Sequence, residues 1–170
     1  QNPLNKNESV MRPSLLPSAL KVVAQNIRSG QSILRVFEWA RVYKGKSEED
    51  WGLAVMSLDK MEVPYFQQDK GKVALDFFDI KGLARSFSDA LSIELDETSS
   101  DAPFLFPKQA VEWQSGKQQA GYFGLLNPLY LKSFGITQRL AVVAINGSKV
   151  ADLLDATPLP SYEAIPKFPA

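Results

Sequence analysis

The sequence predicts an α+β fold in which helices flank a mostly antiparallel sheet. Strand-like segments follow one another across short turns, which is typical of hairpins rather than of regular strand–helix–strand units. Two longer segments carry apolar residues at helical spacing. The chain has 170 residues, of which 45% are hydrophobic, so a single domain can bury a substantial core without disulfides or metals.

The first helix is expected over residues 14–29, after a polar, extended approach over residues 1–12. Ser14 is the expected cap, and Pro17 then falls at the third helical position, where its missing N–H needs no partner. Gly30 is the expected stop. The apolar stripe of this helix consists of Leu15, Leu16, Ala19, Leu20, Val23 and Ile27.

A hairpin follows, with strands over residues 33–44 and 51–58 and a charged turn over residues 44–50. Both faces of the first strand are largely apolar, which predicts a central strand covered on both sides. Residues 59–72 are expected to form a loop.

The second half alternates helices and strands. Asp76 is expected to cap a helix, and a polar loop over residues 92–103 follows it. The remaining predicted elements are strands at 109–114, 119–126 and 138–146, a tight turn at 115–117, short helices at 128–135 and 148–156, and an extended proline-rich tail.

The composition excludes several classes of function. Cysteine and histidine are absent, so disulfides, zinc sites built on those residues, and Ser-His-Asp or Cys-His catalysis are impossible within this chain. Lys+Arg and Asp+Glu both number 19, so the basic excess of a free-standing nucleic-acid binder is missing. No apolar run reaches the roughly 18 residues of a membrane span, so no membrane partner is expected.

Two patterns that suggest chemistry have simpler structural interpretations. Gly116-Lys117 precedes Gln118 and lacks the earlier glycine of a phosphate loop, so a hairpin turn is favoured. The acidic clusters at 48–50, 76–79 and 94–101 are interpreted as a solvated turn, a helix start and a loop. We therefore expect no catalytic, cofactor-binding or metal-binding residue in this chain.

Five stretches carry a more specific pattern, and it extends over essentially the whole chain. They are NPLNKNESVMRPSLLPSAL (2–20), RVFEWARVY (35–43), DFFDIKG (76–82), GYFGLLNP (121–128) and IPKFPA (165–170). In this order they resemble the class II synthetase-like domain of bacterial phenylalanyl-tRNA synthetase β subunits. The resemblance implies a six- or seven-stranded antiparallel sheet with helices, the class II synthetase fold.

The resemblance also implies a role without chemistry. In that family the α subunit binds ATP, phenylalanine and the tRNA end, while the β copy of the fold packs against α in a cytoplasmic enzyme of two α and two β chains. Editing and magnesium sites belong to other β domains. The expected function is therefore assembly with α in support of tRNA-Phe aminoacylation, with ATP and magnesium needed only by the whole enzyme. Contact between tRNA-Phe and this domain is left open.

The chain departs from the family pattern at two places. Where many members read His-Pro-Gly-Arg, it has Phe106-Pro107-Lys108-Gln109, and where they read Gly-x-Leu-His-Pro, it has residues 124–128, GLLNP. A class II site also needs an arginine on a strand and another after a glycine-rich strand. After GYFGLLNP the first arginine is Arg139, so a working catalytic site is not expected.

The predicted α-facing surface combines the helix at 14–29 with the strand at 33–43, as the first motif does in class II dimers. Pro13 biases Arg12 toward an extended backbone, which makes this arginine a positioning residue at the helix entry. The residues assigned to the partner interface are Arg12, Leu20, Val23, Ile27, Arg35, Phe37 and Trp39.

A second hypothesis is a stand-alone amino-acid or small-molecule binding module that borrowed the fold, since a fold does not determine a function. The first hypothesis favours a domain excised from a longer subunit, because Gln1 is an unusual first residue and the family continues beyond the closing FPA. An isolated domain with an exposed partner face is expected to self-associate.

Overall fold

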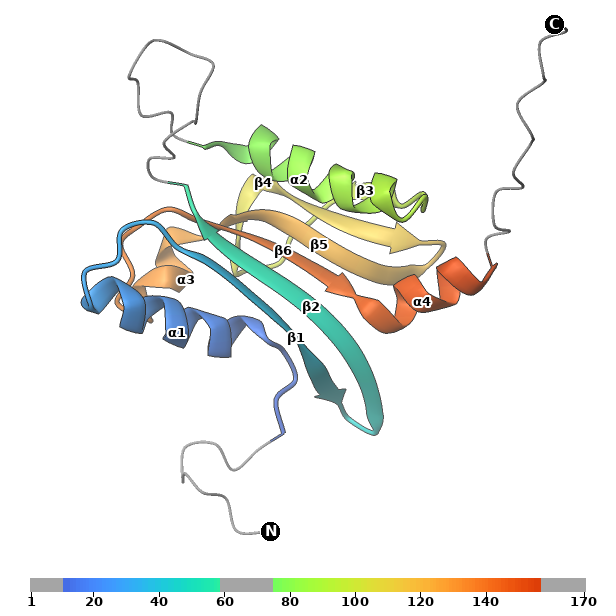
Figure 1. The fold of residues 1–170 in the computed structure, drawn as a ribbon, viewed down its shortest axis with the longest axis horizontal. Coiled ribbons are helices and arrows are strands. Elements are labelled where there is room, and N and C mark those ends of the chain that lie inside the picture. The colour runs from blue at the N-terminus through green and yellow to red at the C-terminus, as the bar shows by residue number, and fades with distance from the viewer. Residues whose placement is uncertain (1–10, 59–74, 157–170) are drawn as a thin grey trace, which may run out of the picture.

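The computed structural model describes residues 11–58 and 75–156, which form a six-stranded antiparallel sheet flanked by helices (Figure 1). The strands are ordered β1-β2-β6-β5-β4-β3, and every neighbouring pair is antiparallel. In chain order the elements are α1 (Leu16–Arg28), β1 (Arg35–Lys44), β2 (Ser47–Ser57), α2 (Phe77–Ala90), β3 (Asp96–Ser99), β4 (Leu105–Ser115), β5 (Gln118–Leu126), α3 (Pro128–Lys132), β6 (Leu140–Asn146) and α4 (Gly147–Ala156).

Two hydrophobic clusters cover the two faces of the sheet. One contains the apolar stripe of α1 and Leu131 of α3, and the other contains Ile80 of α2 and Val150 of α4. Alternate residues of β6 contribute to each cluster, and all residues of this strand are buried. The near-continuous apolar run of β6 follows from this position, because both of its faces are covered.

Both long hairpins close through two-residue turns that begin with glycine. Lys44 pairs with Ser47 around Gly45, and Gly116 occupies the same place between β4 and β5. The φ angles of the two glycines are +64° and +62°, a region that a side chain disfavours. The predicted turn at 115–117 is thus confirmed, whereas the predicted charged turn at 44–50 is too long, because residues 47–50 belong to β2.

The helix starts use side chains of the types the sequence predicts. In α1 the prediction of Ser14 as the cap is corrected, because the cap position is Leu15, which makes no side-chain cap bond, although Ser14 Oγ accepts the N–H of Leu16 at 3.3 Å. Pro17 is consequently the second helical residue, where it still removes no helical hydrogen bond. In α2 a capping box confirms Asp76 as the cap, because Asp76 and Asp79 each accept from the other's backbone N–H.

Four other expectations need correction. β1 lies at the edge of the sheet and is not a central strand. The predicted loop at 92–103 contains the short edge strand β3, and β4 begins at Leu105, before the expected 109. The helix predicted at 128–135 ends at Lys132. Expectations for the approach up to residue 10, for the loop at 59–72 and for the proline-rich tail lie outside the described residues.

Candidate functional site

The edge strand β1 presents one covered and one open face. Val36, Ala40 and Val42 belong to the cluster that contains α1, while Phe37, Trp39 and Arg41 between them are exposed. Phe37 retains 71% of its surface and Trp39 51%, unusually large fractions for aromatic side chains on a sheet. The four residues on this side, here called the β1 outer face, are Arg35, Phe37, Trp39 and Arg41.

Two glycines hold Trp39 in position on this face. Gly52 stands opposite Trp39 in the β1–β2 register, and Gly147 begins α4. A Cβ atom at either glycine would overlap the indole ring, so the ring lies where both residues lack a side chain. The absence of side chains lets the indole lie across β2 as far as the first turn of α4, with half of its surface open to solvent.

Arg41 closes one end of the β1 outer face. Its guanidinium lies 2.9 Å from Glu48 Oε2 and 3.2 Å from Asp50 Oδ1, both on β2. The hydrogen bond to Asp50, supported by the charge of Glu48, raises the pKa of Arg41 above its ordinary value. These pairs fasten Arg41 to its own sheet, so the two aromatic rings are the larger unengaged surface of this face.

Arg12 contacts β1 within the chain. Its carbonyl oxygen accepts the N–H of Tyr43 at 2.9 Å, its Nε donates to the carbonyl of Arg41 at 3.3 Å, and its Nη1 lies 2.6 Å from Glu38 Oε1. Residue 12 thereby pairs with the free edge of β1 near the strand's end. The predicted positioning role of Arg12 at the helix entry is consistent with this geometry, and its ion-pair partner belongs to the same domain.

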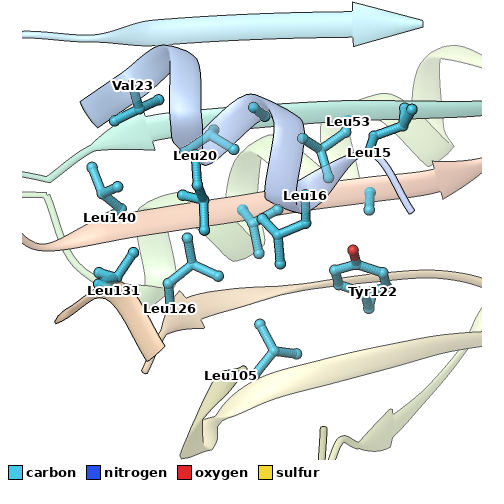
Figure 2. Close-up of a cluster of buried hydrophobic side chains, with 14 of the residues drawn as sticks. Leu15, Leu16, Leu20, Val23, Leu53, Leu105, Tyr122, Leu126, Leu131 and Leu140 are labelled. Atoms are coloured by element: carbon cyan, nitrogen blue, oxygen red, sulfur yellow. The ribbon is translucent and has the colours of Figure 1, made fainter. Parts of the chain in front are cut away.

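The predicted interface residues of α1 occupy the core. Leu20 and Val23 have no exposed surface, and Ile27 packs against the same cluster. Figure 2 shows Leu20 and Val23 among leucines of the sheet and α3. The assignment of Leu20 and Val23 to a partner surface is therefore corrected: their helical spacing marks the face that binds the sheet.

A cavity of about 220 Å³ opens beside the start of α1. Trp51, Phe104 and Tyr122 form its aromatic wall, and Lys44 is its cation. Lys44 Nζ lies 4.6 Å from the Trp51 ring centroid and 3.2 Å from Glu49 Oε2, so its charge is already engaged. Burial raises the pKa of the Tyr122 hydroxyl, against a smaller lowering by a hydrogen bond with Ser14, so this hydroxyl stays protonated.

Two carboxylates that the sequence suggested only as part of acidic clusters connect elements of the fold. Glu49 Oε2 accepts from Trp51 Nε1 at 2.8 Å and from the buried Asn146 Nδ2 at 3.2 Å. The hydrogen bond from Trp51 is the main cause of the lowered pKa of Glu49, and Lys44 lowers this pKa further. Asn146 Oδ1 also accepts the N–H of Lys149, so Glu49 links β2, β6 and the start of α4.

Glu97 plays the corresponding role at the other end of the sheet. Lys81 Nζ lies 2.5 Å from one of its oxygens and Arg85 Nε 3.1 Å from the other. Although burial opposes it, the pKa of Glu97 is lowered by these two cations of α2. A sequence offers no signal for these pairings, because the partners come from separate elements.

The two departures from the family pattern meet in space. β4 and β5 pair Leu105 with Leu126 and Ala110 with Gly124, which places residues 106–109 in a bulge beside residues 124–128. Asn127, where the family pattern has histidine, caps α3 by accepting the N–H of Leu129 at 2.9 Å. Its Nδ2 donates to the carbonyl of Pro103, so this side chain also joins α3 to the chain before β4.

Comparisons with known proteins agree with this architecture. The fold is similar to that of the pyrrolysyl-tRNA synthetase from Desulfitobacterium hafniense, with a TM-score of 0.63 and 15% identity over 86% of this chain and 50% of that one. This similarity confirms the predicted class II synthetase-like α+β fold. Among the described residues no helix is long and apolar enough to cross a membrane.

Sequence relatives are more specific. The chain is 31% identical to the phenylalanine–tRNA ligase β subunits of Moorella thermoacetica and Dehalococcoides mccartyi, over 100% and 99% of its own length respectively. It spans 21% of the length of each relative. The family model described as "Phenylalanyl tRNA synthetase beta chain CLM domain" matches residues 1–146. The chain therefore belongs to the family of phenylalanyl-tRNA synthetase β-chain CLM domains.

Proposed function

We propose that this chain is a non-catalytic, synthetase-like domain that supports assembly of a phenylalanine–tRNA ligase β subunit with its catalytic α subunit. In the complete enzyme, which we place in the cytoplasm as two α and two β chains, α would use ATP and magnesium to charge tRNA-Phe. The domain itself would need no cofactor. The supporting observation is the pair of exposed aromatic rings on the β1 outer face of a β-chain family member.

The geometry favours an assembly surface on β1. Aromatic side chains contribute a large share of the binding energy in protein interfaces, especially where they are already held in one orientation. Trp39 is held by its packing over Gly52 and Gly147, and Phe37 precedes it by two residues on the same side of the strand. The Trp39 ring would therefore lose little conformational freedom when a partner covers it, and Phe37 would add apolar area beside it.

The decisive experiment compares Phe37→Asp with Phe78→Asp. Phe78 lies on α2 and retains 74% of its surface, close to the 71% of Phe37, so it is a matched exposed phenylalanine on a separate element, outside the β1 outer face. The chain is immobilised and titrated with the α subunit of the same organism. We expect Phe37→Asp to weaken binding at least tenfold and Phe78→Asp to leave it within a factor of two.

Circular dichroism and thermal unfolding would confirm that both variants fold. Equal affinities of the two variants, or no binding of α by the unchanged chain, would refute the proposed assembly role. Pyrophosphate exchange with ATP and phenylalanine tests the second part of the proposal. Adenylate formation by this chain without α would show that the domain is itself catalytic.

A further inference from the structure

A larger cavity, of about 530 Å³, lies at the end of the sheet beside α3. It is formed where β2 and β5 end and β6 begins, opposite the end that carries the cavity beside α1. We call it the α3 cavity. Its floor consists of six buried aliphatic side chains, namely Leu58, Leu125, Leu126, Leu131, Ile136 and Leu140.

The volume of the α3 cavity is in the range of ligand sites. Small-molecule pockets typically measure about 300–1,000 Å³ and combine an apolar surface with a few polar groups. A cavity of about 150 Å³ accommodates benzene, so the α3 cavity has room for a molecule of roughly 10–20 non-hydrogen atoms. Its floor would bury an alkyl chain or a ring.

The polar groups of the α3 cavity favour a negative charge. Lys132 and Arg139 are its charged lining residues, and no carboxylate lines it. Neither cation forms an ion pair within residues 11–58 and 75–156, whereas Lys81, Arg85 and Arg41 elsewhere on the surface are all paired. Two unpaired cations around an apolar floor raise the local concentration of anions and favour an acidic head group.

Two glutamine side chains also line the α3 cavity. The side-chain oxygen of Gln138 is buried and accepts no hydrogen bond from any described residue. Phe106 and Gln109, from the first departure from the family pattern, line the same cavity. This wall therefore combines an apolar ring with amide groups, in keeping with a ligand that is apolar at one end and polar at the other.

We infer that the α3 cavity binds a small amphiphilic anion, with an apolar body on the leucine floor and one carboxylate or phosphate head near Lys132 and Arg139. This site is separate from the β1 outer face, and the inference does not depend on binding of α. Other surfaces match it less well, since the cation of the cavity beside α1 is already paired with Glu49.

Isothermal titration with a set of eight-carbon compounds tests this inference. The ligands are octanoate, octyl phosphate, octan-1-ol and octylamine, which share one apolar body and differ in the head group. We expect one saturable site for octanoate or octyl phosphate, and the comparison of these two distinguishes a carboxylate from a phosphate ligand. The neutral alcohol should bind at least fivefold more weakly, and octylamine should show no saturable binding.

The double variant Lys132→Gln/Arg139→Gln identifies the location of the site. Partly exposed charge interactions contribute modestly, so removal of both cations should weaken anion binding about five- to tenfold. The control is Lys21→Gln/Lys117→Gln, which removes two exposed cations from α1 and the β4–β5 turn and should leave the affinity unchanged. Both variants change surface charge without altering the core, and thermal unfolding checks their folding.

A second variant, Thr137→Trp, would fill the α3 cavity from its lining and should abolish binding, whereas Thr137→Ser should not. The inference is overturned if no anion binds at millimolar concentration, if octan-1-ol binds as tightly as octanoate, or if the double cation variant binds like its control.

Discussion

Lys108 occupies a backbone conformation that suits glycine, and its replacement gives a quantitative test of the structure. Its φ angle is +64°, within the bulge where the β4–β5 register shifts between Leu105 and Ala110. A residue with a Cβ atom in this region is destabilised by about 1–2 kcal/mol. Glycine removes that strain, but it also makes the unfolded chain more flexible, which offsets about 0.4–1 kcal/mol.

Lys108→Gly should therefore raise the free energy of unfolding by about 0.5–1 kcal/mol. For a chain of this size such a gain corresponds to an increase in Tm of about 1–4 °C. Urea unfolding should show a higher midpoint with an unchanged m-value, because the surface exposed on unfolding is the same. The family pattern His-Pro-Gly-Arg places glycine at this position, in agreement with the conformation of the bulge.

Two controls separate backbone strain from loss of the lysine side chain. Lys108→Ala removes the same charge and most of the side chain but keeps Cβ, so it should give no comparable gain. Lys117→Gly, in the β4–β5 turn where φ is not positive, should instead lose about 0.4–1 kcal/mol. The reasoning is refuted if Lys108→Ala stabilises as much as Lys108→Gly, or if the glycine variant is less stable than the original chain.

Two further predictions concern ion pairs within the domain. Arg12→Met keeps the aliphatic stem but removes the donors to Glu38 and to the Arg41 carbonyl, so it should lower the free energy of unfolding by about 1 kcal/mol. A double-mutant cycle with Glu38→Gln should give a coupling of about 0.5 kcal/mol, and additive effects would contradict the pair. Because the folded-state pKa of Glu49 lies below its ordinary 4.5, ionised Glu49 stabilises the fold above that pH and loses this contribution as pH falls through the folded value. The difference in Tm between the original chain and Glu49→Gln should accordingly be largest near pH 7 and shrink below pH 4.5, and a constant difference would contradict the assignment.

The elements with a strong local signal could be predicted from the sequence. The capping box of Asp76, the glycine at each hairpin turn and the apolar stripe of α1 are all properties of a few neighbouring residues. The short strand β3 has no such signal, because its sequence DETS is polar and its side chains are exposed or half-buried. It exists only through its pairing with β4, a contact that local periodicity does not encode.

The candidate site was predictable only in part, because burial depends on which elements meet. The spacing of Leu20 and Val23 showed an apolar face, but the partner of that face is the domain's own sheet. No sequence pattern predicts the α3 cavity, since its lining comes from the residue after β2, from β4, β5 and α3, and from the segment before β6 and the start of that strand. Its two cations become neighbours of one apolar floor only after the sheet is assembled.

The difference between the predicted and observed burial of β1 supports the proposed function. Apolar residues on both faces of this strand predicted a strand covered on both sides, and the domain covers only the side of Val36, Ala40 and Val42. A solvated edge strand ordinarily has polar residues on its open face, and the exposure of Phe37 and Trp39 departs from that rule. If the periodicity of β1 reflects burial in the assembled enzyme, then its open face is the side that a partner covers. The affinities of Phe37→Asp and Phe78→Asp for α therefore also test whether the apolar residues on the open face of β1 are buried in the complex.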